Sequence, residues 1–323
     1  MFVKKNISII FLLLGFCSII LIFFNLELPD DTHLWREIHN TGHTPLFGML
    51  SLLFLSLSSL ILGKRLLKQY FHYLIALVLT VLMGAITELI QIYGPGDADI
   101  SDLIRDILGA VSFLGLYVVF NPKMIVFWRK RNNIRIFTFV SAFLLLFLSI
   151  IPVSMWAWAY HQRNQAFPQI LGFESSLENK FTRTNNAELV KTHPPAGWKN
   201  PNSRHVGQLT LFRDTYPGFS LEEPFPNWTA YRYMSFFVYS ELNTTVNLTM
   251  RIEDIHHNNF YDDRFNYSII INPGLNQISI PLEKVKNAPS YREMDMTAIY
   301  AIYFFVVRPG KPFILYFDDL RLE

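Results

Sequence analysis

The chain has few charged residues and a single cysteine. Because Cys17 is the only cysteine, the sequence excludes a disulfide framework and a cysteine-based metal site. Cys17 lies inside an apolar run. Only 17% of the residues are charged and the formal net charge is +2, so the composition gives no reason to expect a nucleic-acid partner. The sequence also lacks a nucleotide-binding motif, a serine nucleophile elbow and an HExxH metal-binding pair.

Hydrophobic residues are abundant and are concentrated before Tyr160. They make up 51% of the 323 residues, and the mean hydropathy of +0.23 is too high for an ordinary soluble protein. Five segments are apolar over about 20 residues, the length of a membrane helix. They are residues 7–24, 43–62, 70–93, 103–120 and 136–160. No small-residue cleavage site follows the first segment, so we expect it to be retained.

The charges of the connecting loops alternate along the chain. Lys4 and Lys5 precede the first segment, and the second and fourth connections are rich in Lys and Arg, whereas the others are mainly acidic. The positive-inside rule then places the N-terminus in the cytoplasm and everything after Tyr160 outside. We therefore expect a transmembrane α-helical bundle of five helices in residues 1–160, in a bacterial cytoplasmic (inner) membrane.

Polar residues of three segments fall in one layer near the outer membrane face. Glu88 lies about 7 Å deeper than Tyr93 at 1.5 Å per residue. Gly84 and Gly109 would allow the third and fourth segments to approach closely. Charges inside a membrane are costly and usually have a task. The sequence predicts a shallow outward pocket beneath the turn at residues 94–96, with these candidate catalytic or binding residues: His43, Glu88, Gln91, Asp102, Arg105 and Asp106.

A purely structural interpretation of this layer stays open. Arg105 could neutralise Glu88 or Asp106 and so hold the hairpin together as an ion pair. His43 could be an interfacial residue without a role.

The same residues resemble those of the bacterial VanZ-like membrane proteins over about residues 7–120. That family has a His followed by an aromatic residue, then E-x-x-Q, then D-x-x-x-N-x-x-G; the chain has His43 with Phe47, Glu88 with Gln91, and Asp102, Asp106 and Gly109. Asp106 stands where the family usually has Asn, and an Arg that often precedes the Asp is absent. The resemblance implies a role in the cell envelope and in susceptibility to teicoplanin-type glycopeptides.

Residues 161–323 show a different pattern, which predicts an all-β jelly-roll sandwich. Short runs alternate polar and apolar residues between Gly, Pro and Asn, and they are rich in Tyr, Phe, Ile, Val and Thr. The expected strands are residues 208–213, 233–240, 245–252, 267–271, 277–281, 298–307 and 313–317.

This second region resembles the galactose-binding-like jelly rolls of carbohydrate-binding modules. Phe173-Glu174 opens it, Trp228 and Tyr231 form W-x-x-Y, and I-L-Y-F-D-D-L-R-L closes it. The resemblance implies a structural calcium ion, for which Glu174 and Asp319 are the candidate ligands, since calcium prefers hard oxygen donors. Both could equally be ordinary surface acids.

Sugar binding would need exposed aromatic side chains and planar polar groups in loops. The candidates are Trp198, Trp228, His256, His257, Tyr261 and Arg264. Aromatic residues of β-sandwiches are mostly core residues, and the two histidines could be exposed loop residues without a ligand.

Three kinds of function fit these features. The first is a cell-envelope membrane protein whose outer module binds an envelope glycan or glycolipid. The second is an enzyme acting on a lipid-linked sugar or phosphate at the outer leaflet, and the third is a small proton-coupled transporter. We favour the first, because no enzyme motif and no inverted repeat is found. The expected partners are the lipid bilayer and an envelope glycan or glycolipid.

Overall fold

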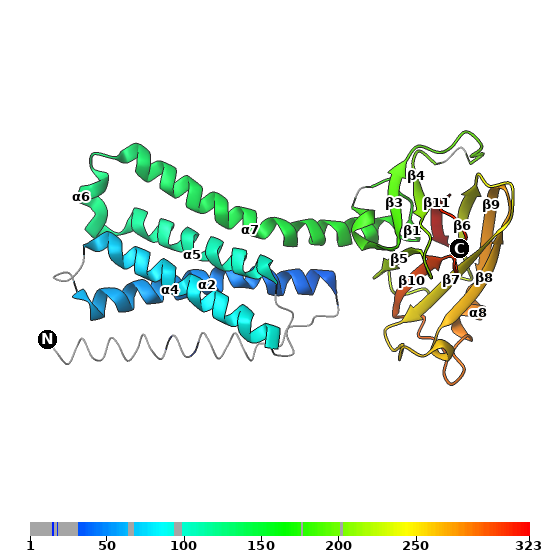
Figure 1. The fold of residues 1–323 in the computed structure, drawn as a ribbon, viewed down its shortest axis with the longest axis horizontal. Helices are drawn as coiled ribbons and strands as arrows, with labels where there is room; N and C mark the ends of the chain where they lie inside the picture. The colour runs from blue at the N-terminus through cyan, green and yellow to red at the C-terminus, as the bar shows by residue number, and fades with distance from the viewer. Residues whose placement is uncertain are drawn as a thin grey trace. The chain divides into compact units, whose positions relative to one another are not determined.

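The computed structural model describes residues 15, 18, 32–63, 68–93, 99–175, 177–200 and 203–323. Contacts divide the chain into two compact units, Met1–Ala157 and Trp158–Glu323, which are helical and β-rich respectively (Figure 1). Several predictions lie outside the described residues: the span at 7–24 with Cys17, the turn at 94–96, and most of the basic residues before the third span.

Four of the described helices are long and apolar enough to cross a membrane. They are α2 (His33–Ile61), α4 (Gln69–Tyr93), α5 (Ile100–Phe120) and α7 (Asn132–Ala166), with η1 (Pro122–Met124) and α6 (Ile125–Trp128) between the last two. Each of these four overlaps one of the last four predicted spans, so this part of the chain is helical and fits a membrane environment.

The start of α2 corrects the predicted span at 43–62. The helix begins ten residues earlier, where the Thr32 side chain caps it by accepting a hydrogen bond from the Trp35 N–H at 3.3 Å. Glu37, expected in a loop, therefore lies within the helix.

Helices α2, α4 and α5 pack against one another through small residues. A Cβ atom on Gly109 of α5 would lie 2.0 Å from the Thr44 carbonyl oxygen of α2, so only glycine allows this approach. Gly84 of α4 instead faces Leu103 and Asp106 of α5. The expectation that both glycines join the same two helices is thus wrong for Gly109, which contacts α2.

The second unit is an antiparallel β-sandwich. One sheet has the order β3-β4-β11-β6-β9 with β1 beside β11, and the other has the order β2-β5-β10-β7-β8. The strands are β1 (Gln169–Leu171), β2 (Thr182–Asn185), β3 (Ala187–Thr192), β4 (Val206–Leu211), β5 (Gly218–Glu222), β6 (Tyr233–Ser240), β7 (Val246–Asp254), β8 (Phe265–Ile271), β9 (Gly274–Pro281), β10 (Ile299–Phe305) and β11 (Phe313–Leu322). Short helices η2 (Glu178–Phe181), η3 (Tyr261–Asp263) and α8 (Leu282–Lys286) connect them.

Aromatic side chains join the two sheets. Phe219 and Phe304 of one sheet meet Phe236 and Phe317 of the other, with ring centroids 5.2–5.5 Å apart. Alternation along β10 turns Phe304 into this core and leaves Tyr303 and Phe305 on the opposite face of the sheet.

Candidate functional site

A buried histidine–aspartate pair lies between α2 and α5. His43 Nδ1 is 2.9 Å from Asp106 Oδ1, and His43 Nε2 is 3.9 Å from Asp102 Oδ2. The two aspartates are four residues apart on α5 and so face the same side. The side chains of His43 and Asp106 are 3% and 0% exposed, so the pair is shielded from bulk solvent. The structure therefore brings together three of the predicted residues.

Arg105 forms ion pairs with carboxylates other than Glu88 and Asp106, the partners expected from the sequence. Its guanidinium lies 2.5 Å from Asp102 and 3.1 Å from Glu37. Because neighbouring positions on a helix point about 100° apart, Arg105 is directed away from Asp106 and toward the carboxylate one turn before it. The proposed pairing with Glu88 or Asp106 is thus not what the described residues show. Glu37 was not among the predicted site residues, because the predicted span began at residue 43 and left Glu37 in a loop.

Glu88 connects α4 to the beginning of α5. Its Oε2 atom accepts a hydrogen bond from the Asp99 N–H at 2.9 Å. Asp99 is the N-cap of α5, and its side chain accepts from the Ser101 N–H at 2.8 Å. One carboxylate oxygen of Glu88 therefore has a structural role at the helix start.

Three oxygen atoms in this layer lack a hydrogen-bond partner among the described residues. Asp106 Oδ2, Glu88 Oε1 and Gln91 Oε1 are buried and unpaired. A buried acceptor without a donor costs about 1–3 kcal/mol, so such atoms are rare without a ligand, a proton or a water. Gly84 leaves the space beside Asp106, because a Cβ atom there would lie 2.6 Å from Oδ2. The arrangement can accept hydrogen bonds from a bound donor group.

The second candidate site is a groove of about 650 Å³ on the sheet β2-β5-β10-β7-β8. Five of its lining residues are consecutive cross-strand neighbours, one from each strand. In strand order they are Arg183, Ser220, Tyr303, Arg251 and Asn266. The alternation of side chains in a strand places this row on the face opposite the core.

Exposed aromatic rings lie in the groove. Tyr216 and Tyr261 are 53% and 66% exposed, and the Arg264 guanidinium lies 5.3 Å from the centre of the Tyr261 ring. Aromatic faces bind the apolar faces of a ligand, while Arg and Asn donate hydrogen bonds to its oxygens. This combination suits a saccharide.

The floor of the groove is held by buried polar contacts. The Tyr303 hydroxyl donates to Glu253 at 2.9 Å, Glu253 also pairs with Arg251, and the Arg251 guanidinium lies 4.6 Å from the centre of the Tyr303 ring. Burial and the Glu253 charge raise the pKa of the Tyr303 hydroxyl above its ordinary value. The phenol therefore stays a hydrogen-bond donor at neutral pH.

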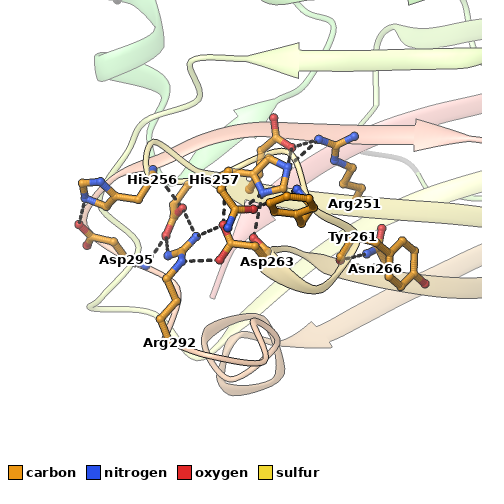
Figure 2. Close-up of polar contacts among 12 residues, drawn as sticks. Arg251, His256, His257, Tyr261, Asp263, Asn266, Arg292 and Asp295 are labelled. Atoms are coloured by element: carbon orange, nitrogen blue, oxygen red, sulfur yellow. Dashed lines mark hydrogen bonds and ion pairs between the residues drawn. The ribbon is translucent and has the colours of Figure 1, made fainter.

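A network of ion pairs fixes the loop that leads into β8 (Figure 2). Arg292 lies 2.5 Å from both Asp254 and Asp263, and Asp263 also accepts from the Asn258 N–H at 2.9 Å. The hydrogen bonds from Arg292 hold the pKa of Asp263 below its ordinary value. The network lies next to Tyr261 and Arg264 in sequence and so supports the edge of the groove.

Of the six residues predicted to contact a sugar, only Tyr261 and Arg264 line the groove. Trp228 is wrong as a ligand residue, because it is 0% exposed and its indole N–H donates to the Phe225 carbonyl at 2.7 Å. Trp198 packs against Phe237 and Tyr239, which belong to the other sheet.

The two adjacent histidines belong to the loop network in Figure 2. The His257 side chain is 5% exposed and lies between Glu253 and Asp263, at 3.6 and 3.5 Å. His256 is exposed and lies 3.6 Å from Asp295. Neither lines the groove, so sugar binding by these two residues stays a prediction.

Five residues of the groove were not predicted to bind a sugar: Arg183, Tyr216, Arg251, Tyr303 and Asn266. Alternation along β7 and β10 does put Arg251 and Tyr303 on the side away from the core. Which residues become neighbours depends on strand order and register, and no single strand reveals these.

The predicted calcium ligands, Glu174 and Asp319, line one pocket together with Asp318. Burial raises the pKa of Asp318 to about 6. Glu174 accepts from the Arg204 and His205 N–H groups at 3.0 and 3.2 Å, and Asp319 pairs with Arg321. Within the described part of the chain, no three such side chains form a cluster that could hold a metal ion. Carboxylates suit calcium, but their present partners do not leave a ready site, so calcium stays a prediction.

Comparisons with known proteins concern the sandwich. No protein-family model matches the chain, and no curated protein matches it. A family 11 carbohydrate-binding module from Clostridium thermocellum in complex with a β-1,3-1,4-mixed-linked tetrasaccharide is similar at a TM-score of 0.37 and 16% identity, over 48% of this chain and 93% of that chain.

An exo-β-agarase is similar at a TM-score of 0.39 and 15% identity, and the similarity covers 48% of this chain but only 24% of the agarase. A solution structure of CtCBM11 gives a TM-score of 0.35 at 17% identity, over 48% of this chain and 92% of that one. Similarities at this level do not show what the present chain binds. The antiparallel sandwich is evident from its own two sheets.

Proposed function

We propose that this protein is a membrane-anchored glycan-binding protein of the bacterial cell envelope. The observation that carries the proposal is the groove on the five-stranded sheet, where exposed tyrosines stand beside guanidinium and amide donors. The apolar helices would hold the chain in the cytoplasmic membrane. The distribution of loop charges favours a cytoplasmic N-terminus and an extracytoplasmic sandwich.

The glycan-binding proposal is tested with the full chain in detergent or nanodiscs against a panel of neutral and charged oligosaccharides. We expect Tyr216→Ala and Tyr261→Ala each to weaken binding about two- to tenfold, the value of an aromatic contact worth 0.5–1.5 kcal/mol. Tyr291→Ala is the matched control, since Tyr291 is 94% exposed and does not line the groove. Absence of binding to every glycan in the panel would end the proposal.

A second candidate function rests on the helical unit. We propose that the layer of His43, Glu88 and Asp106 is a site for a lipid-linked sugar or phosphate at the outer leaflet, as the VanZ-like resemblance of these residues suggests. The supporting observation is the set of buried oxygens without a donor in the described residues, which can accept hydrogen bonds from the hydroxyl groups of the sugar. His43, hydrogen-bonded to Asp106, would serve as acid or base. A proton-coupled transporter would use the same groups.

Susceptibility to a teicoplanin-type glycopeptide tests this second candidate. Cells that lack the protein are complemented with the natural chain, Glu88→Gln or His43→Gln at equal membrane levels. We expect both variants to lose the effect of the natural chain. Unchanged susceptibility with Glu88→Gln would remove the active-site interpretation, and proton uptake by reconstituted vesicles would identify a transporter instead of an enzyme.

A further inference from the structure

All the charged side chains that line the groove are positively charged. Three are arginines, Arg183, Arg251 and Arg264, and none of the described lining residues is Asp or Glu. A groove for a neutral glycan needs hydrogen-bond donors and acceptors in similar number, because sugar hydroxyls do both. This groove offers many donors and no carboxylate acceptor.

The three arginines differ in how far their charge is already neutralised. Arg251 pairs with the buried Glu253. Arg183 is 53% exposed and lies 3.9 Å from Glu222, a distance and exposure at which an ion pair contributes little. Arg264 has no ion pair and no side-chain hydrogen bond with any described residue, and its guanidinium lies beside the Tyr261 ring.

Arg251 and Arg264 also act on each other. Burial and the nearby Arg251 charge lower the pKa of Arg264 from its ordinary value. The Nε atoms of both side chains are buried without a hydrogen-bond acceptor in the described part of the chain. Two like charges held together with unused donors are stabilised when an anion binds between or beside them.

The arginines lie at opposite sides of the sheet. Arg183 is on the edge strand β2, and Arg264 directly precedes the other edge strand β8, four strand-to-strand steps away. At about 4.8 Å per step this is about 19 Å. One small anion cannot reach both, whereas a chain with several anionic groups can.

Accepting the proposed glycan-binding function, we propose that the groove selects an anionic glycan, one that carries carboxylate or phosphate groups at more than one position. Tyr216 and Tyr261 contact the sugar rings, and the fork of Arg264 binds one anionic group with two parallel hydrogen bonds. Arg183 binds a second group at the far edge of the sheet.

The test uses the full chain and three probes of similar length. They are an α-1,4-linked oligogalacturonate, the same oligomer after reduction of its carboxyl groups, and a poly(glycerol phosphate) chain. We expect an anionic probe to bind at least about tenfold more tightly than the reduced one, with an affinity that falls as salt is added. The preferred anionic probe identifies carboxylate or phosphate as the group recognised.

Variants assign the selectivity to named residues. Arg264→Gln should lose about tenfold in affinity for the anionic probe and nothing for the reduced one, and Arg264→Lys should recover part of the loss, since it restores the charge but not the fork. Arg183→Gln, at an exposed position, should lose less affinity and should leave the fold unchanged. Arg232→Gln is the control, because this exposed side chain is outside the groove.

The outcomes separate this inference from the proposed function. Equal affinity for both anionic probes and for the reduced oligomer, with the loss still seen in Tyr261→Ala, would overturn anion selectivity and leave glycan binding intact. Arg232→Gln as damaging as Arg264→Gln would also overturn it, since attraction would then come from overall charge. Absence of binding to all three probes and to the wider panel would overturn both.

Discussion

Each unit of this protein contains a buried cluster of acidic and basic side chains, but the two clusters differ in how completely their oxygens are paired. In the sandwich, Asp254 accepts four hydrogen bonds: from the His256 and Asp295 N–H groups and from two nitrogens of Arg292. In the helical unit, Asp106 is equally buried, yet only its Oδ1 atom has a partner among the described residues.

The difference separates a structural cluster from a candidate site. A saturated carboxylate has little left to offer a ligand, and its removal leaves a cation unpaired. An unsaturated one costs stability in the resting protein and can regain it by binding a donor. The presence of His, Asp and Arg together therefore says less about function than the number of acceptor positions still open.

The largest effect is expected from Asp254→Asn, which tests the saturated cluster. Its side chain is 0% exposed, so the variant removes one of the two carboxylates that pair with Arg292 and should destabilise the sandwich by about 3–5 kcal/mol. Urea unfolding followed by sandwich fluorescence measures this. Asp262→Asn, at an exposed position of the same loop, should stay within about 0.5 kcal/mol. Equal effects of the two would show that saturation does not matter.

Acid should weaken the same cluster. The pKa of Asp263 is held below its ordinary value by Arg292, so its stabilising contribution is complete above about pH 4 and is lost as the pH falls through the lowered folded-state pKa. We expect a loss of about 2 kcal/mol, typical of hydrogen bonds to a charged group. Melting temperatures measured from pH 7 down to pH 2 check this. An Asp263→Asn variant should show a flatter profile, and a profile as steep as that of the natural chain would assign the acid loss to other groups.

Much of the fold could be predicted from local sequence. The predicted strand at 233–240 is the observed β6, because the apolar residues Met234, Phe236 and Val238 recur at every second position and face the core. The third span is predicted within one residue because α4 is apolar over most of its length. The start of α2 was missed since a hydropathy criterion detects lipid-facing residues, whereas Thr32 sets the true beginning by capping a polar first turn.

The sites were predictable only where one short segment carries them. Asp102 and Asp106 share a helix face, so their proximity follows from spacing alone. The row of cross-strand neighbours that lines the groove begins with Arg183 on β2. The sequence of β2, Thr-Arg-Thr-Asn, has no apolar alternation, and neither β2 nor β5 was predicted. Long-range register decides which side chains meet there, and the same limit hid the contact between Arg105 and Glu37.

A bound calcium ion would join Glu174 and Asp319 into a third cluster, beside those around Asp254 and Asp106. If it binds, calcium at ten times its dissociation constant should stabilise the sandwich by about 1.4 kcal/mol and raise the melting temperature by a few degrees. Melting of the full chain in EGTA and in millimolar calcium measures this. Glu174→Gln should abolish the shift, and Glu188→Gln, at an exposed position, should keep it. A shift that persists in Glu174→Gln would contradict the site.

The smallest change in stability, and the sharpest test of the comparison, is expected from Asp106→Asn. The amide oxygen can still accept from His43, and the variant removes a buried charge whose second oxygen has no described donor. Stability of the full chain should therefore change by no more than about 1 kcal/mol, measured as the monodisperse fraction that survives heating in detergent.

Asp102→Asn is the control for this substitution, because it removes a partner of Arg105 on the same helix and should cost more. If the open oxygen of Asp106 serves a ligand, Asp106→Asn should change glycopeptide susceptibility while the protein stays folded. A variant that unfolds as readily as Asp254→Asn would show instead that both carboxylates are structural. The number of open acceptor positions would then fail to distinguish the two units.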